Sequence, residues 1–145
     1  MNARFRTTHA LVAVLLLAAC SADEPAPLVA SDVQVSAPRG GMPMRAGYLT
    51  LRNNTAEPIR VTSAASPSFA SVELHETIYD DGIARMRPVP VVVIEPNDEV
   101  AFEPGGMHLM LMRPIGDGAA SDRVQLDFYD GERLLISVTT EQGSD

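Results

Sequence analysis

Residues 71–87, SVELHETIYDDGIARMR, have the pattern of a β-hairpin. Apolar and polar residues alternate before and after Asp81-Gly82. This dipeptide favours a two-residue turn in which both residues have positive φ. The segment therefore predicts two antiparallel strands joined by a tight loop.

The length of that loop decides which side chains share a face of the hairpin. A two-residue loop places Thr77 opposite Met86, with His75 on the same face and diagonal to Met86, within reach of long side chains. A three-residue loop is the alternative. It would shift the register by one, place Met86 opposite Glu76 and remove Met86 from the face of His75.

Short alternating segments separated by turn residues occupy the rest of the chain. We expect strands at residues 33–37, 47–52, 59–64, 71–79, 83–87, 90–94, 99–102, 108–113, 124–129 and 134–140. Short strands that recur about every ten residues are typical of an all-β sandwich or barrel. The length of 145 residues suits one domain. The sequence therefore predicts a single all-β domain.

The N-terminal segment has the pattern of a lipoprotein signal. Arg4 and Arg6 precede an apolar run over residues 10–19, and Cys20, the only cysteine of the chain, follows directly. The end of the run resembles a bacterial lipobox, in which the cysteine is acylated and becomes the first mature residue. An ordinary signal peptide with an incidental cysteine is the alternative. We expect a signal peptide over 1–19, the lipidated cysteine and a flexible tether over 20–31, the folded domain over 32–141 and a short tail over 142–145.

A lipidated Cys20 predicts attachment to the periplasmic face of a bacterial membrane, and Ser21 directly after it favours the outer membrane. The folded part then has no thiol, which excludes disulfides, zinc–thiolate sites and cysteine nucleophiles. A formal charge of −8 makes nucleic acid an unsuitable partner. Because no Ser-His-Asp arrangement, catalytic carboxylate pair or phosphate loop is recognisable, we do not expect an enzyme.

Histidine and methionine are the residues that could carry chemistry. His75 and His108 are the histidines beyond the signal, and six of the seven methionines also follow it. Thioethers are soft, neutral ligands that suit Cu(I), and imidazole is an acceptable partner for the same ion. Ca²⁺ and Mg²⁺ would need clustered oxygen ligands instead. The composition therefore favours a soft monovalent metal.

Strand alternation indicates how these residues could meet. In residues 108–113 the leucines form one face, so His108 and Met110 project together from the other. The hairpin would supply His75 and Met86, and this strand would supply His108 and Met110. These four residues are the candidate metal ligands.

The remaining methionines have less specific interpretations. Met107 and Met112 neighbour the candidate site and could shield it or act as auxiliary ligands. Met42 and Met44 are interpreted as packing residues where a strand begins, with a ligand role as the less favoured alternative. The glutamates beside His75 are interpreted as solvated acids.

The spacing His75-x10-Met86-x21-His108-x-Met110 resembles the signature of the periplasmic copper chaperones called PCu(A)C. The segments GYLTLRNNT, VELHET, MRPV and EPGGMHLMLM are also similar, and the resemblance covers about residues 32–141. Many relatives carry methionine directly after the first histidine, where this chain has Glu76. The tail lacks the His/Met-rich extension of some relatives, so a second copper site is not expected.

The resemblance implies a cupredoxin-like Greek-key β sandwich that binds one Cu(I) through His75, Met86, His108 and Met110. It also implies delivery of copper to the binuclear site of cytochrome c oxidase subunit II, or to another copper assembly protein. Two alternatives stay open. One is a cupredoxin for electron transfer, although a blue-copper site needs a cysteine thiolate. The other is a lipoprotein adhesion or assembly module in which every methionine serves packing.

Overall fold

The computed structural model describes residues 25–37, 40–116, 120–121 and 123–141. The predicted signal peptide over 1–19, the candidate lipidation site Cys20 and the predicted tail over 142–145 lie outside these residues. Within the described part of the chain, no helix has the length and apolarity needed to cross a membrane.

Eleven strands make up most of the described chain. They are β1 (Leu28–Val35), β2 (Met44–Asn53), β3 (Ile59–Val61), β4 (Ser63–Ala65), β5 (Phe69–Asp80), β6 (Ile83–Pro88), β7 (Val92–Ile94), β8 (Glu99–Phe102), β9 (Met107–Pro114), β10 (Arg123–Asp130) and β11 (Arg133–Glu141). The prediction of an all-β fold with one domain is confirmed.

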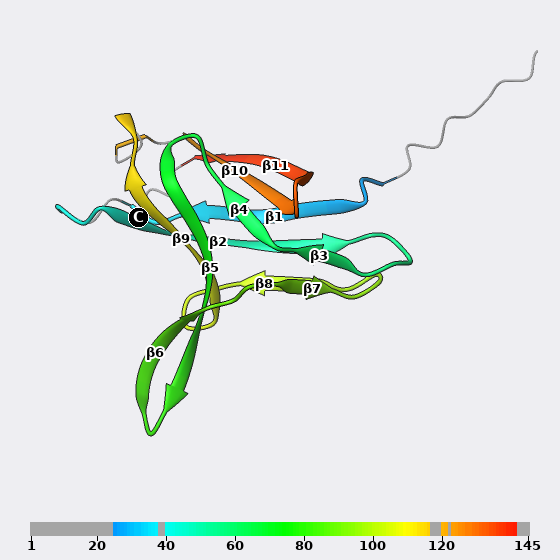
Figure 1. The fold of residues 1–145 in the computed structure, drawn as a ribbon, viewed down its shortest axis with the longest axis horizontal. Coiled ribbons are helices and arrows are strands. Elements are labelled where there is room, and N and C mark those ends of the chain that lie inside the picture. Colours follow the sequence, from blue (N-terminus) through cyan, green and yellow to red (C-terminus); the bar gives the residue numbers. More distant parts are fainter. Residues whose placement is uncertain (1–24, 38–39, 117–119, 122, 142–145) are drawn as a thin grey trace, which may run out of the picture.

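Most strands belong to one strongly curved sheet. Its order is β1-β2-β9-β5-β4-β10-β11, with β6 added to β5 and β8 added to β2, while β3 and β7 form a small second sheet (Figure 1). The two ends of the long sheet meet, because the Thr140 hydroxyl in β11 donates to the Val33 carbonyl in β1 at 2.6 Å. Neighbours distant in sequence, such as β2 and β9, give the Greek-key character of the fold.

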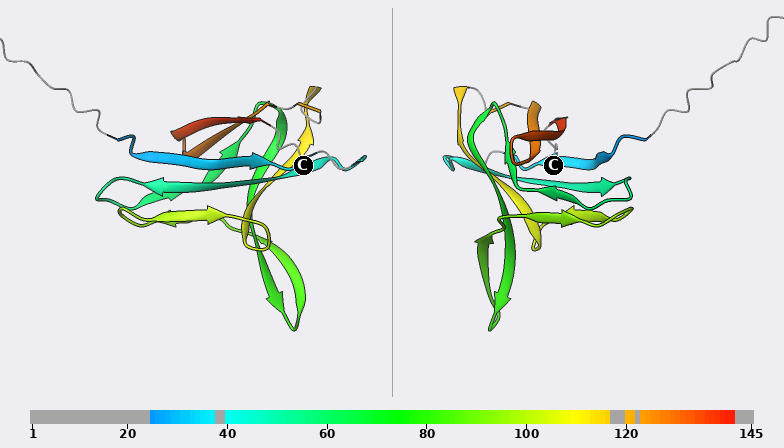
Figure 2. Two further views of the ribbon diagram at one scale, coloured as in Figure 1. Left: turned by 180° about the vertical axis from the view of Figure 1, so that it is seen from behind. Right: turned by 45° about the vertical axis from the view of Figure 1, so that its right-hand side comes forward.

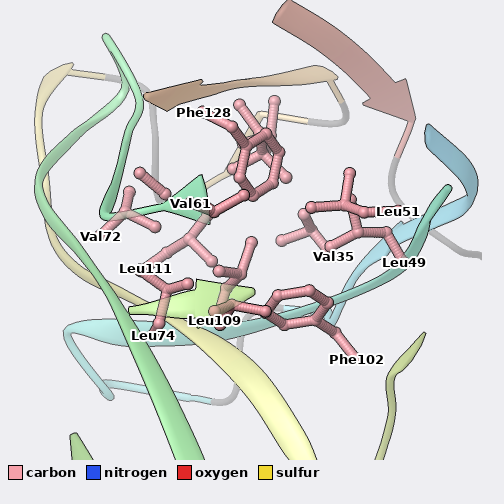
Figure 3. Packing of buried hydrophobic residues seen from close by; sticks show 14 of the residues in the cluster. Val35, Leu49, Leu51, Val61, Val72, Leu74, Phe102, Leu109, Leu111 and Phe128 are labelled. Carbon is pink, nitrogen blue, oxygen red and sulfur yellow. The ribbon is translucent and has the colours of Figure 1, made fainter. Parts of the chain in front are cut away.

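The core fills the inside of this curved sheet. Leu49 and Leu51 from β2, Leu109 and Leu111 from β9, and Phe128 from β10 are all at most 2% exposed (Figure 3). Burial of this apolar surface is the main favourable contribution to folding. Because the β9 leucines point inwards, alternation directs His108 and Met110 to the opposite face, as the sequence predicts.

The strand predicted over residues 59–64 is two strands, and this expectation was wrong. The chain leaves the small sheet after β3 and joins the large sheet at β4. Thr62 lies at the break, where its backbone N–H and its hydroxyl both donate to the Tyr129 carbonyl, at 2.8 and 3.2 Å. These contacts come from a segment far away in sequence, so no local pattern marks the break.

The folded domain begins earlier than predicted. Residues 28–31 were assigned to the tether, but they form the first half of β1, with Leu28 opposite Asn53 of β2. Leu28 is 4% exposed and belongs to the core. Because this side chain is buried, the ordered structure includes part of the segment that was predicted to be a tether.

The hairpin of β5 and β6 has the predicted two-residue loop. Asp81 and Gly82 have φ values of 50° and 79°, and Thr77 lies opposite Met86. The three-residue alternative is therefore excluded. The hairpin projects away from the rest of the sheet (Figures 1 and 2), and every residue of β6 is exposed.

Candidate metal centre

The four predicted ligands lie on one face of the sheet, where β5 runs between β6 and β9. His75 in β5 is directly opposite His108 in β9, and the two ring centroids are 6.1 Å apart. Met110 follows His108 by two residues on the same face. Met86 in β6 is opposite Thr77 and therefore diagonal to His75. The register brings together residues from three strands.

A surface pocket of about 230 Å³ joins three of these side chains. Met86, His108 and Met110 line it, together with Thr77 from β5. His75 is not one of the residues that line it, but its ring lies beside that of His108, which does. The Thr77 N–H donates to the Gly106 carbonyl at 3.0 Å, which holds the loop before β9 against the base of the hairpin. The pocket is therefore built where the hairpin leaves the sheet.

His108 has a defined orientation. The residue is 6% exposed, and its Nδ1 lies 3.1 Å from the Gly106 carbonyl oxygen. Because a carbonyl only accepts hydrogen bonds, Nδ1 must carry the hydrogen. In the neutral ring the lone pair is then on Nε2. A backbone contact of this kind fixes the tautomer of a metal-binding histidine.

His75 is oriented by a carboxylate. Its Nε2 lies 2.9 Å from Oε2 of Glu73, which accepts the hydrogen bond and leaves the lone pair of the neutral ring on Nδ1. Among the described residues, no group donates a hydrogen bond to Nδ1, although this atom is buried. A buried acceptor without a partner is costly in a folded protein. A metal bound at Nδ1 would satisfy it.

Glu73 belongs to this site although it was not predicted to. It was grouped with the solvated acids, yet it contacts His75 from the same face of β5. Glu73 and His75 are two residues apart on one strand and therefore share a face, which could have indicated their contact. Glu76, the other glutamate beside His75, lies on the opposite face and pairs with Arg87. The two glutamates therefore have different environments.

Of the other methionines, Met107 faces the core, whereas Met42, Met44 and Met112 do not. Met107 packs against the core on the same side as the leucines of β9, so it does not point toward the candidate ligands. Met112 shares the face of Met110 and lies opposite Met44 of β2. Met42 and Met44 are 59% and 38% exposed, so the interpretation of these two as packing residues was wrong.

The donor set suits a soft metal ion. It comprises two imidazole nitrogens and two thioether sulfurs, all neutral, and Met86 is 61% exposed. The described residues contain no group of three or more His, Cys, Asp and Glu side chains that could hold a metal ion. Neutral nitrogen and sulfur donors match the preference of Cu(I).

Comparison with protein families matches residues 28–140 to the family described as putative lipoprotein LpqE-like. Among curated proteins, "Uncharacterized protein RP573" of Rickettsia prowazekii (strain Madrid E) is 31% identical over 103 residues. The match covers 69% of this chain and 57% of that protein, so the chain spans little more than half of the relative's length.

Solved structures have the same fold. The copper-bound PCuAC domain from PmoF2 has a TM-score of 0.65 at 16% identity, and the match covers 82% of this chain and 94% of that one. The apo PCuAC domain from PmoF1 has a TM-score of 0.62 at 14% identity, with 82% and 95% covered. Apo-DR1885 from Deinococcus radiodurans has a TM-score of 0.60 at 24% identity, with 99% and 97% covered. This chain has the fold of a PCuAC domain and belongs to the LpqE-like family of putative lipoproteins.

Proposed function

We propose that this protein is an extracytoplasmic copper chaperone that binds one Cu(I) through His75, Met86, His108 and Met110. The observation that carries the proposal is the placement of these four side chains on one face, across three strands, with the Nδ1 atom of His75 buried and unpartnered among the described residues. The likeness to a fold for which a copper-bound structure exists supports it.

The donor set suits a carrier that must release its metal. The four ligands are neutral, so the bound ion keeps its single charge and no thiolate holds it. Met86 is exposed on the projecting hairpin. A ligand of the acceptor can therefore displace this thioether first and approach the ion from solvent, after which the other ligands exchange one at a time. Such a protein binds and transfers an ion and catalyses no covalent step.

The proposed location is the periplasmic face of a bacterial membrane, with the outer membrane favoured. The lipobox-like sequence ending at Cys20 and the family description as putative lipoprotein support this location. Acyl chains on Cys20 would hold the domain at the membrane surface. The proposed acceptor is the binuclear copper site of cytochrome c oxidase subunit II, or another copper assembly protein, both of which face the same compartment.

Anaerobic competition titration of the full chain against a chromogenic Cu(I) chelator tests the proposal. Met86→Leu is the most informative variant, because Met86 is exposed and leucine preserves its approximate volume, so the fold should be unaffected. We expect the Cu(I) affinity to fall by more than the roughly tenfold that loss of a ligand's hydrogen-bond partner costs. Met107→Leu is the matched control, since Met107 faces the core, and its affinity should be unchanged.

Equal affinities of the wild-type protein and both variants would contradict the proposed ligand set. If the wild-type protein binds no Cu(I) at all, the assembly module without a metal role becomes the better description. Transfer is tested separately by mixing the Cu(I)-loaded chain with the apo soluble domain of oxidase subunit II. The expected result is appearance of the binuclear copper spectrum, once an oxidant is added to complete the mixed-valence centre.

A further inference from the structure

A second pocket lies on the same face of the sheet, next to the one described above. Its volume is about 210 Å³, and Met42, Met44 and Met110 contribute to its lining. Ala46, Tyr48 and Met110 line both pockets. The two pockets therefore adjoin each other at Met110, which is one of the four candidate ligands.

The pairing of β2 with β9 explains why methionines gather there. Met44 lies opposite Met112, and Ala46 lies opposite Met110, so Met44 is diagonal to Met110. Diagonal neighbours on one sheet face are within reach of long side chains. Ala46 carries only a methyl group, which leaves room above it for the thioethers of its neighbours.

These methionines do not serve the core. Met42 and Met44 are 59% and 38% exposed, whereas a methionine that fills a core is normally buried. Their unbranched side chains rotate readily and can bring sulfur toward an ion in the pocket. Met42 and Met44 therefore offer two exposed thioethers beside the thioether of Met110, which belongs to the candidate metal site. All three donors of this set are sulfur atoms.

We propose that Met42, Met44 and Met110 form an auxiliary thioether site that holds Cu(I) on its way to or from the four-residue site. This inference rests on the proposed function, because Met110 is a ligand of both sites. Since Met110 is shared, one ion occupies one site or the other. Transfer from the four-residue site breaks the bonds from copper to the two histidine nitrogens and to the sulfur of Met86, and forms bonds to the sulfurs of Met42 and Met44. Copper stays in the same oxidation state.

One charged side chain borders this pocket. Arg45 also lines the pocket, and its Nε and Nη1 donate to the carbonyls of Ser36 and Ser121 at 2.7 and 3.0 Å. A neighbouring positive charge repels a divalent cation about twice as strongly as a monovalent one. Beside the three thioethers, this cation disfavours Cu(II) more strongly than Cu(I).

The first test follows the methyl groups of methionine by NMR in the full chain, with Cu(I) added under anaerobic conditions. In the variant His75→Ala/His108→Ala, we expect the methyl signals of Met42, Met44 and Met110 to shift, because the auxiliary site remains. Adding M42L and M44L to this variant should abolish the binding. Absence of any shift in the folded histidine variant would overturn the inference.

Because His108 is buried and its loss can unfold the chain, a second measurement keeps both histidines and replaces the exposed Met42 and Met44. The release of Cu(I) from M42L/M44L to a chelator in excess should be several-fold slower than from the wild-type protein, while the control M107L should release at the wild-type rate. Equal release rates in all three proteins would overturn the auxiliary site and leave the four-residue site standing. If the wild-type protein binds no Cu(I), the proposed function fails as well.

Discussion

Replacing Glu73 by alanine should weaken Cu(I) binding although Glu73 is not a proposed ligand. The carboxylate accepts a hydrogen bond from Nε2 of His75 at 2.9 Å, and in the neutral ring this contact leaves the lone pair on the buried Nδ1. In Glu73→Ala, the ring can rotate and exchange its tautomers. Part of the population then has no lone pair where the metal should bind.

The expected size of the effect follows from the exposure of the contact. Loss of a hydrogen-bond partner of a metal-binding histidine typically lowers metal affinity by about tenfold to a hundredfold. The Glu73 side chain is 47% exposed, so water can replace part of the lost contact. We therefore expect the lower end of this range, about tenfold, which corresponds to about 1.4 kcal/mol of binding free energy. Glu73→Gln keeps an acceptor and should lose less.

Glu76→Ala provides the matched control. It removes the same charge from the same strand, but Glu76 lies on the opposite face and pairs with Arg87. Chelator competition at one ionic strength should therefore give a near wild-type Cu(I) affinity for Glu76→Ala. If both alanine variants lose Cu(I) affinity to the same extent relative to the wild-type protein, Glu73 acts only through its charge. The proposed role of Glu73 in orienting His75 would then be refuted.

Three substitutions test the account of the fold. Asn53→Ala removes a fully buried side chain whose Nδ2 donates to three backbone carbonyls, so urea unfolding should show a loss of about 3 kcal/mol. Gly47→Ala places a Cβ atom 3.1 Å from Leu109 Cβ and should lower stability by about 1–3 kcal/mol in thermal melting, whereas Gly40→Ala, where space is open, should change it little. Thr140→Val removes a hydrogen bond between the two ends of the sheet and should cost about 1 kcal/mol in the same urea assay.

Local chemistry made part of the site predictable from the sequence. The Asp81-Gly82 turn requires two residues with positive φ, and few dipeptides accept this, so the sequence predicted the hairpin and favoured the two-residue loop, while the structure excluded the three-residue alternative. Alternation then assigned His75 and Met86 to one face of the hairpin. The same period of two assigned His108 and Met110 to the face opposite the core.

Contacts between distant segments were not predictable in this way. The break at Thr62 depends on the Tyr129 carbonyl, and the early start of β1 depends on burial of Leu28. The auxiliary pocket requires Met44 to lie beside β9, which is more than fifty residues away in sequence. No local sequence pattern predicts these contacts, because they form only when distant strands pair in the sheet.

The central claim is that two histidines and two methionines bind one Cu(I). Copper K-edge X-ray absorption of the anaerobically loaded chain at one equivalent measures this coordination directly. The account predicts a first coordination shell that contains sulfur and light scatterers of the nitrogen type in equal numbers, two of each per copper. A shell without sulfur, or a chain that retains no copper after desalting, would contradict it.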